Sequence, residues 1–95
     1  MRSSKKISKI RLIGFQKVND DSVNAIGYLC PNATSITFSE CHFREVESLQ
    51  VLKEKSVSLI LEGCTVKEGV RMSKDASKWL IVREEGGVRH LQVAL

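Results

Sequence analysis

The chain has 95 residues and a net charge of +4, and 42% of its residues are hydrophobic but only 5% aromatic. This length allows one domain, whose core must be built mainly from aliphatic side chains. A single proline and the lack of a long polar tract argue against a disordered or linker class. No apolar run approaches the ~20 residues that a membrane-spanning helix needs, so we expect no membrane partner.

Part of the positive charge gathers at the start of the chain. We interpret residues 1–6 as a solvated basic tail and residues 7–95 as a single domain. The other charges are mixed in sign, which makes nucleic acid an unlikely partner although the isoelectric point is about 9.2. The three cysteines are odd in number and no secretory signal is visible, so we expect free thiols in an intracellular protein. We favour the cytoplasm, with a mitochondrial or nuclear location left open.

A short pattern occurs three times, in residues 7–15, 33–41 and 57–64. Each copy has two apolar residues separated by one, followed three places later by Phe or Cys. The first apolar positions are Ile10, Ile36 and Leu59, so the steps are 36 − 10 = 26 and 59 − 36 = 23 residues. A period of 20–29 residues is typical of repeats in which short parallel strands stack side by side.

The pattern predicts parallel strands near residues 9–13, 35–39 and 58–62. Helices are predicted near 21–30 and 44–54 from apolar residues at spacings of three and four, and a shorter one in 66–76. Asp20, Asp21 and Ser22 are typical of a helix start, and Pro31 ends the first helix. The predicted core consists of Ile10, Leu12, Val23, Ile26, Ile36, Phe38, Val46, Leu49, Leu52, Leu59 and Leu61.

Cys41 and Cys64 occupy the same repeat position, where the strand ends, and Phe15 is their counterpart in the first copy. No CxxC motif or histidine at ligand spacing accompanies them, although His42 follows Cys41 directly. We therefore interpret both cysteines as small buried core residues and expect neither a metal site nor a cofactor.

The run from Ile10 to Phe43 resembles the cysteine-containing leucine-rich repeats of F-box proteins. Val18-Asn19-Asp20-Asp21 matches the middle of that repeat and Cys30-Pro31-Asn32 its end, whereas Ala33 and Phe15 depart from it. A mitochondrial assembly factor of the coupling-factor-B type is an equal relative. The resemblance implies an α/β fold: a short leucine-rich-repeat solenoid with parallel strands and helices on the convex side. It also implies an adaptor that recognises ubiquitin-ligase substrates or, for the mitochondrial relative, assists complex assembly.

The end of the chain differs from the repeats. Two apolar runs, 79–84 and 88–93, flank Gly86-Gly87, which can supply a tight turn. We expect a β-hairpin that caps the stack, or one irregular repeat with a capping strand. Trp79 is interpreted as a partly buried core residue, with a binding hot spot as the alternative.

The residues between the core positions should face outward together, because side chains alternate along a strand. Ile13 and Ile60 are aliphatic in this polar field, and Arg11 has a guanidinium able to pair with a partner's carboxylate. The candidates for binding another protein are Lys9, Arg11, Ile13, Thr37, Ser39, Ile60 and Glu62.

We expect no enzymatic activity, since the phosphate-binding and dinucleotide motifs are absent and His42 and His90 have no partner at a catalytic spacing. The function predicted is a protein-binding module, with self-association possible. The alternatives are a basic nucleic-acid-binding domain and a regulatory domain like those of sulfate transporters and anti-sigma factors, with Asp21-Ser22 before a helix.

Overall fold

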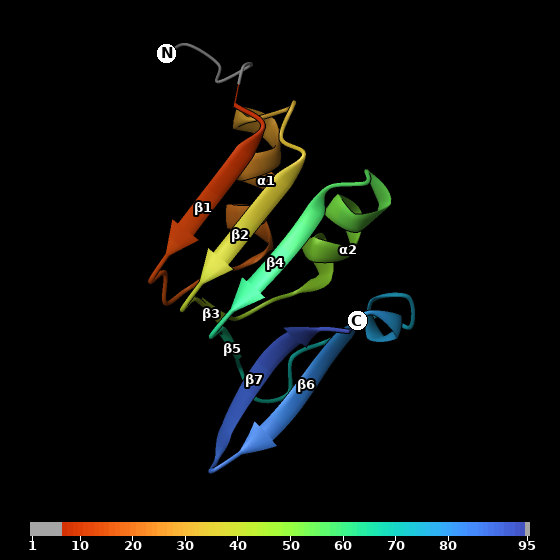
Figure 1. Ribbon diagram of the computed structural model, residues 1–95. Coiled ribbons are helices and arrows are strands. Elements are labelled where there is room, and N and C mark those ends of the chain that lie inside the picture. The colour runs from red at the N-terminus through yellow and green to blue at the C-terminus, as the bar shows by residue number, and fades with distance from the viewer. Residues whose placement is uncertain (1–6, 95) are drawn as a thin grey trace.

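The computed structural model describes residues 7–94. It contains two α-helices and two β-sheets (Figure 1). The elements in chain order are β1 (Lys9–Ile13), α1 (Asp20–Leu29), β2 (Ser35–Ser39), β3 (His42–Phe43), α2 (Glu47–Glu54), β4 (Ser58–Glu62), β5 (Thr65–Val66), the short 3-10 helix η1 (Ala76–Lys78), β6 (Leu80–Glu85) and β7 (Val88–Val93). The predicted tail, residues 1–6, lies outside the described residues.

The first sheet has the order β1-β2-β4, and all its pairs are parallel. Ile10 pairs with Ile36, which pairs with Leu59, in the register that the repeat spacing indicates. Both helices lie on the same face of this sheet (Figure 1). One face of the sheet is therefore packed against helices, and the other is open.

The helices begin and end close to the predicted bounds. The Asn19 side chain accepts a hydrogen bond from Ser22 N–H at 2.9 Å, so α1 begins at Asp20. The Asp20 carboxylate accepts bonds from the backbone N–H and the hydroxyl of Ser48, at 2.9 and 2.8 Å, which ties the starts of the two helices together. α2 begins three residues later than predicted: β3 ends at Phe43, and the Arg44 N–H donates to the Val18 carbonyl at 2.7 Å, outside the helix.

The chain turns sharply after each strand of the first sheet. Gly14, Glu40 and Gly63 stand one residue beyond β1, β2 and β4, and all three have positive φ, at 75°, 52° and 61°. This left-handed conformation favours glycine, so Glu40 is held there by its surroundings. Its N–H donates to the carbonyl of Glu62 at 2.7 Å. The turns direct β3 and β5 into the second sheet.

The second sheet has the order β3-β5-β7-β6 and mixes directions. β3 and β5 are parallel, whereas β7 is antiparallel to both β5 and β6. β6 and β7 form the predicted hairpin, and Gly86 and Gly87 supply the two positive φ angles of its turn.

The predicted solenoid is wrong. The chain folds instead as a small compact α/β domain with two helices and two sheets. The third repeat has no α-helix in residues 66–76, where Gly69 has a φ of 71°. After β5 the chain returns as a hairpin that pairs antiparallel with β5, so the repeating direction ends there.

The core extends through both sheets. Seven of the eleven predicted core residues are buried, while Ile10, Leu12, Ile26 and Leu61 are only partly buried and pack against the core. Three of these four lie in the outer strands β1 and β4, which have a neighbour on one side only. The prediction missed the buried residues of the second sheet and its surroundings, namely Val18, Phe43, Val66, Ala76, Leu80 and Leu91.

We predict that Phe38→Ala lowers the free energy of unfolding by about 3–5 kcal/mol, because a fully buried ring leaves a cavity. Leu61→Ala should cost less, near the lower end of about 2–5 kcal/mol, since its side chain lies beside solvent. Urea unfolding followed by circular dichroism measures both values. Equal losses for the two variants would contradict this description of the core.

Candidate functional site

The open face of the first sheet, defined by the side chains that point away from α1 and α2, contains all seven candidate residues. The register aligns Arg11, Thr37 and Ile60 in one row across the three strands, and Ile13, Ser39 and Glu62 in the next. The third row is Lys9, Ser35 and Ser58. Positions that are far apart in the sequence thus form one surface.

The residues on the outer strands are the accessible ones. Ile13 is 61% exposed and Ile60 is 42% exposed, both high values for isoleucine. Thr37 and Ser39 on the central strand are less exposed and lie half-buried, because neighbouring side chains flank them on both sides. The open face therefore offers two aliphatic contacts at its margins and small hydroxyl groups in the middle.

Arg11 and Glu62 form an ion pair at 3.2 Å that crosses the open face from β1 to β4. Arg11 was expected to offer its guanidinium to a partner's carboxylate, whereas the structure pairs it within the chain. Both side chains remain at least half exposed, so the pair contributes little to stability. It lies between Ile13 and Ile60, so the two isoleucines do not form one continuous apolar patch.

Phe15 lies at a site that sequence reasoning missed. Its counterparts Cys41 and Cys64 are 1% exposed, whereas Phe15 is 54% exposed. Beside it is a notch of about 250 Å³ lined by Leu12, Phe15, Lys17, Val18, Ser22 and Ile26. The sequence held one signal of this exposure: Phe15 stands at the repeat position that Cys41 and Cys64 occupy, and a phenyl ring does not fit the space that a cysteine fills.

A second hollow, of about 490 Å³, lies on the helical side, and its lining includes residues from both α1 and α2. Tyr28 is 85% exposed at its rim, and Val51 stands on the opposite helix. Gly27 contributes no side chain, which leaves space between the helices. This hollow has no charged cluster, and Lys55 is its only ionic group.

Cys41 and Cys64 are free and buried, as the sequence predicts. The Cys64 thiol lies 3.1 Å from the carbonyl oxygen of Phe38, to which it donates, and the Cys41 thiol lies 3.5 Å from that of Leu12. Burial raises the pKa of the Cys64 thiol, which keeps it protonated at neutral pH. Both thiols thus contact carbonyl groups of the neighbouring strand.

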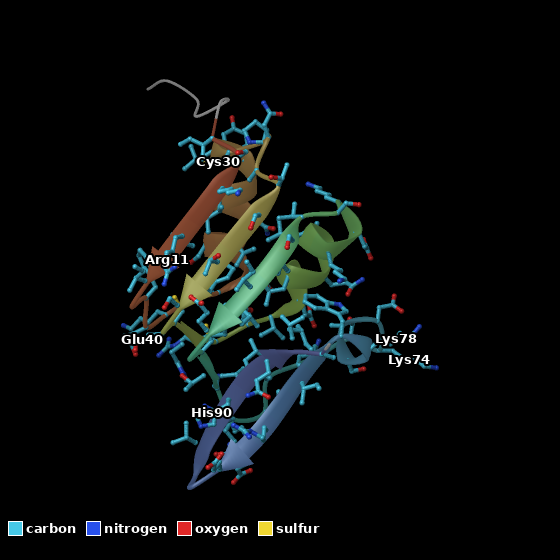
Figure 2. All side chains as sticks on the ribbon, in the orientation of Figure 1. Arg11, Cys30, Glu40, Lys74, Lys78 and His90 are labelled. Carbon is cyan, nitrogen blue, oxygen red and sulfur yellow. The ribbon has the colours of Figure 1, made fainter. Side chains whose placement is uncertain are left out.

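The two histidines, distant in the sequence, lie on either side of Thr65 in the second sheet. His42 Nδ1 is 2.8 Å from Thr65 Oγ1. His90, which is labelled on β7 in Figure 2, pairs with Thr65 across β5 and β7. No carboxylate among residues 7–94 bonds to either ring in a way that would orient it as a base. Nor do three His, Cys, Asp or Glu side chains of this range gather as metal ligands.

Comparisons with protein-family models, curated protein sequences and solved structures give no significant match to the chain. The resemblance to cysteine-containing repeats of F-box proteins therefore stays a prediction from local motifs. Within residues 7–94, no helix is both long enough and apolar enough to cross a membrane.

We predict that one of the three thiols reacts quickly with Ellman's reagent at neutral pH. Cys30 is partly accessible, whereas the other two thiols are buried, and thiolate formation at Cys64 is further disfavoured by its raised pKa. The two slow thiols should react only when denaturant unfolds the chain. Rapid reaction of all three in the folded protein, with Cys30→Ser as the reference variant, would contradict the burial described above.

Proposed function

We propose that the protein is a non-enzymatic binding module that docks another protein on the open face of the first sheet. The observation that supports this proposal is the uncovered parallel sheet. Parallel sheets occur almost only where both faces are covered. Here α1 and α2 cover one face of β1, β2 and β4, and no element within residues 7–94 covers the opposite face (Figure 1).

The chemistry of the open face fits a protein better than a nucleic acid. Its charged groups are Lys9, Arg11 and Glu62, and Arg11 is already paired with the acidic one. Among the described residues, the outward positions of β1, β2 and β4 carry no aromatic side chain on which a base could stack. Exposed Ile13 and Ile60 beside hydroxyl groups are typical of a mixed protein interface. Three free cysteines favour a role inside the cell, as an adaptor without a cofactor.

We predict that a photo-reactive amino acid at position 60 cross-links a partner protein in cells, because Ile60 is accessible at the margin of the open face. The same amino acid at position 28 on α1 is the matched control, since Tyr28 is more exposed but lies on the helical side. Mass spectrometry of the adducts identifies the partner.

Ile60→Asp should then weaken binding of that partner by about tenfold or more, since it places a charge in an apolar contact. Circular dichroism verifies that the variant is folded. Equal capture from positions 60 and 28, or unchanged affinity of the folded variant, would refute docking on the open face.

A further inference from the structure

The two outer edges of the first sheet, at β1 and at β4, differ in how the rest of the chain covers them. At the β4 end the chain itself closes the core: Leu91 N–H donates to the Cys64 carbonyl at 3.0 Å, which docks the hairpin beside β5. Trp79 is buried there, and its indole Nε1–H donates to the Gln50 side chain at 2.6 Å. Lys53 lies over the same ring at 5.2 Å from its centroid. The β1 end has no corresponding closure within residues 7–94.

β1 leaves one edge of its main chain unpaired. Gly14 N–H donates to Ser39 O at 2.9 Å, and Ser8 O accepts from Ser35 N–H at 3.1 Å, so these residues turn their main-chain groups toward β2. Successive residues of a strand direct these groups to opposite edges. The N–H and C=O groups of Lys9, Arg11 and Ile13 therefore face away from β2, where the described chain supplies no strand.

The notch near Phe15 lies beside this edge. Its lining comes from β1, from α1 and from the segment between them, and includes nothing from β2, β4 or α2. Leu12 and Ile26 are only partly buried there, and Phe15 is exposed. A side chain on a strand added to β1 would point into this space if it stood beside Leu12 on the helical side of the sheet.

The edge is also positively charged. Lys9 and Arg11 project from β1 on the open face, and Lys17 lines the notch. Neither lysine forms an ion pair within the described residues, and the only acidic partner of Arg11 is the exposed Glu62. An added strand would meet positive charge on the open face and an apolar notch on the helical side.

We propose that the outer edge of β1 binds an extended segment of another protein in which acidic and large aliphatic residues alternate. Main-chain hydrogen bonds to Lys9, Arg11 and Ile13 would hold the segment as an additional strand. Its aliphatic side chains enter the notch beside Leu12 and Phe15, and its acidic side chains lie next to Lys9 and Arg11. This inference rests on the proposed function and specifies the partner's chemistry.

A second copy of the chain is a poorer occupant of the same edge. Antiparallel pairing of two β1 strands centred on Arg11 places the two Arg11 residues directly opposite each other. Two chains of charge +4 also repel each other. Charge complementarity therefore favours an acidic segment over self-association.

The probe is a capped seven-residue peptide in which glutamate alternates with leucine, and the control peptide has lysine in place of each glutamate. Amide hydrogen exchange measured by NMR reports on β1 residue by residue. Bound glutamate peptide should slow exchange at the amides of Lys9, Arg11 and Ile13. The amides of Ile10 and Leu12 already face β2 and should change little. The lysine peptide should bind at least tenfold more weakly.

Two variants at one position separate main-chain pairing from side-chain contact. Ile13→Pro removes the outward N–H, and edge strands tolerate proline where the N–H faces solvent. Ile13→Ala keeps that N–H but removes the exposed side chain. We expect Ile13→Pro to weaken the glutamate peptide about tenfold and Ile13→Ala less than about threefold. If Ile13→Pro does not fold, a glutamate peptide N-methylated at alternate residues replaces it and should show the same loss.

Unchanged exchange at Lys9, Arg11 and Ile13 on addition of the glutamate peptide overturns the inference, as does equal binding of the two peptides. Protection of these amides that grows with protein concentration in the absence of peptide assigns the edge to a second copy, which also overturns it. If these amides stay unprotected while position 60 still cross-links a partner, the proposed function stands and only the strand addition fails.

Discussion

β2 is hydrogen-bonded on both sides, to β1 and to β4, in one in-register parallel ladder. This register places Ile36 and Phe38 at the centre of the helical side, where both are buried. It also brings the three sharp turns after the strands next to one another, so the segments that follow can pair again as a second sheet. The Phe38 and Phe43 rings meet edge to face, with their centroids 5.0 Å apart, and make the core continuous between the two sheets. A slip of one residue in the ladder would expose both Phe38 and Ile36 and separate these turns.

The two outer strands of the first sheet, β1 and β4, differ in how their outer edges are covered, and this difference determines where another chain could pair. A sheet edge with unpaired main-chain groups invites pairing with other chains, so proteins commonly cover or charge it. At the β4 end, the hairpin and Trp79 cover the core. At the β1 end, Lys9 and Arg11 supply positive charge but leave the main chain accessible. Such an edge rejects another positively charged strand while remaining open to an acidic one.

The open face and the β1 edge are adjacent, and β1 belongs to both. A partner that adds a strand beside β1 would extend the sheet and at the same time reach the margin of the open face at Ile13. The Arg11–Glu62 pair lies on that face, is solvent-exposed and costs little to open. Arg11 can thus exchange Glu62 for an acidic side chain of the partner with little loss of stability. The two proposed contacts are compatible parts of one interface.

Much of the local structure was predictable from the sequence: the three parallel strands, both helices and the hairpin at Gly86-Gly87 follow from periodicity and turn residues. The residues of the open face were also predictable, because the alternation along each strand and the spacing of the three repeats can both be read from the sequence. The prediction of a solenoid was wrong, because the repeat pattern carries no information on how the chain continues after β5. Only tertiary packing decided that the hairpin returns antiparallel against β5 and that Arg11 on β1 pairs with Glu62 on β4, across β2. Likewise, Phe15 is exposed and the outer edge of β1 is unpaired because nothing in the described chain packs against them. Whether a segment packs there depends on long-range contacts, which a pattern in the sequence does not specify.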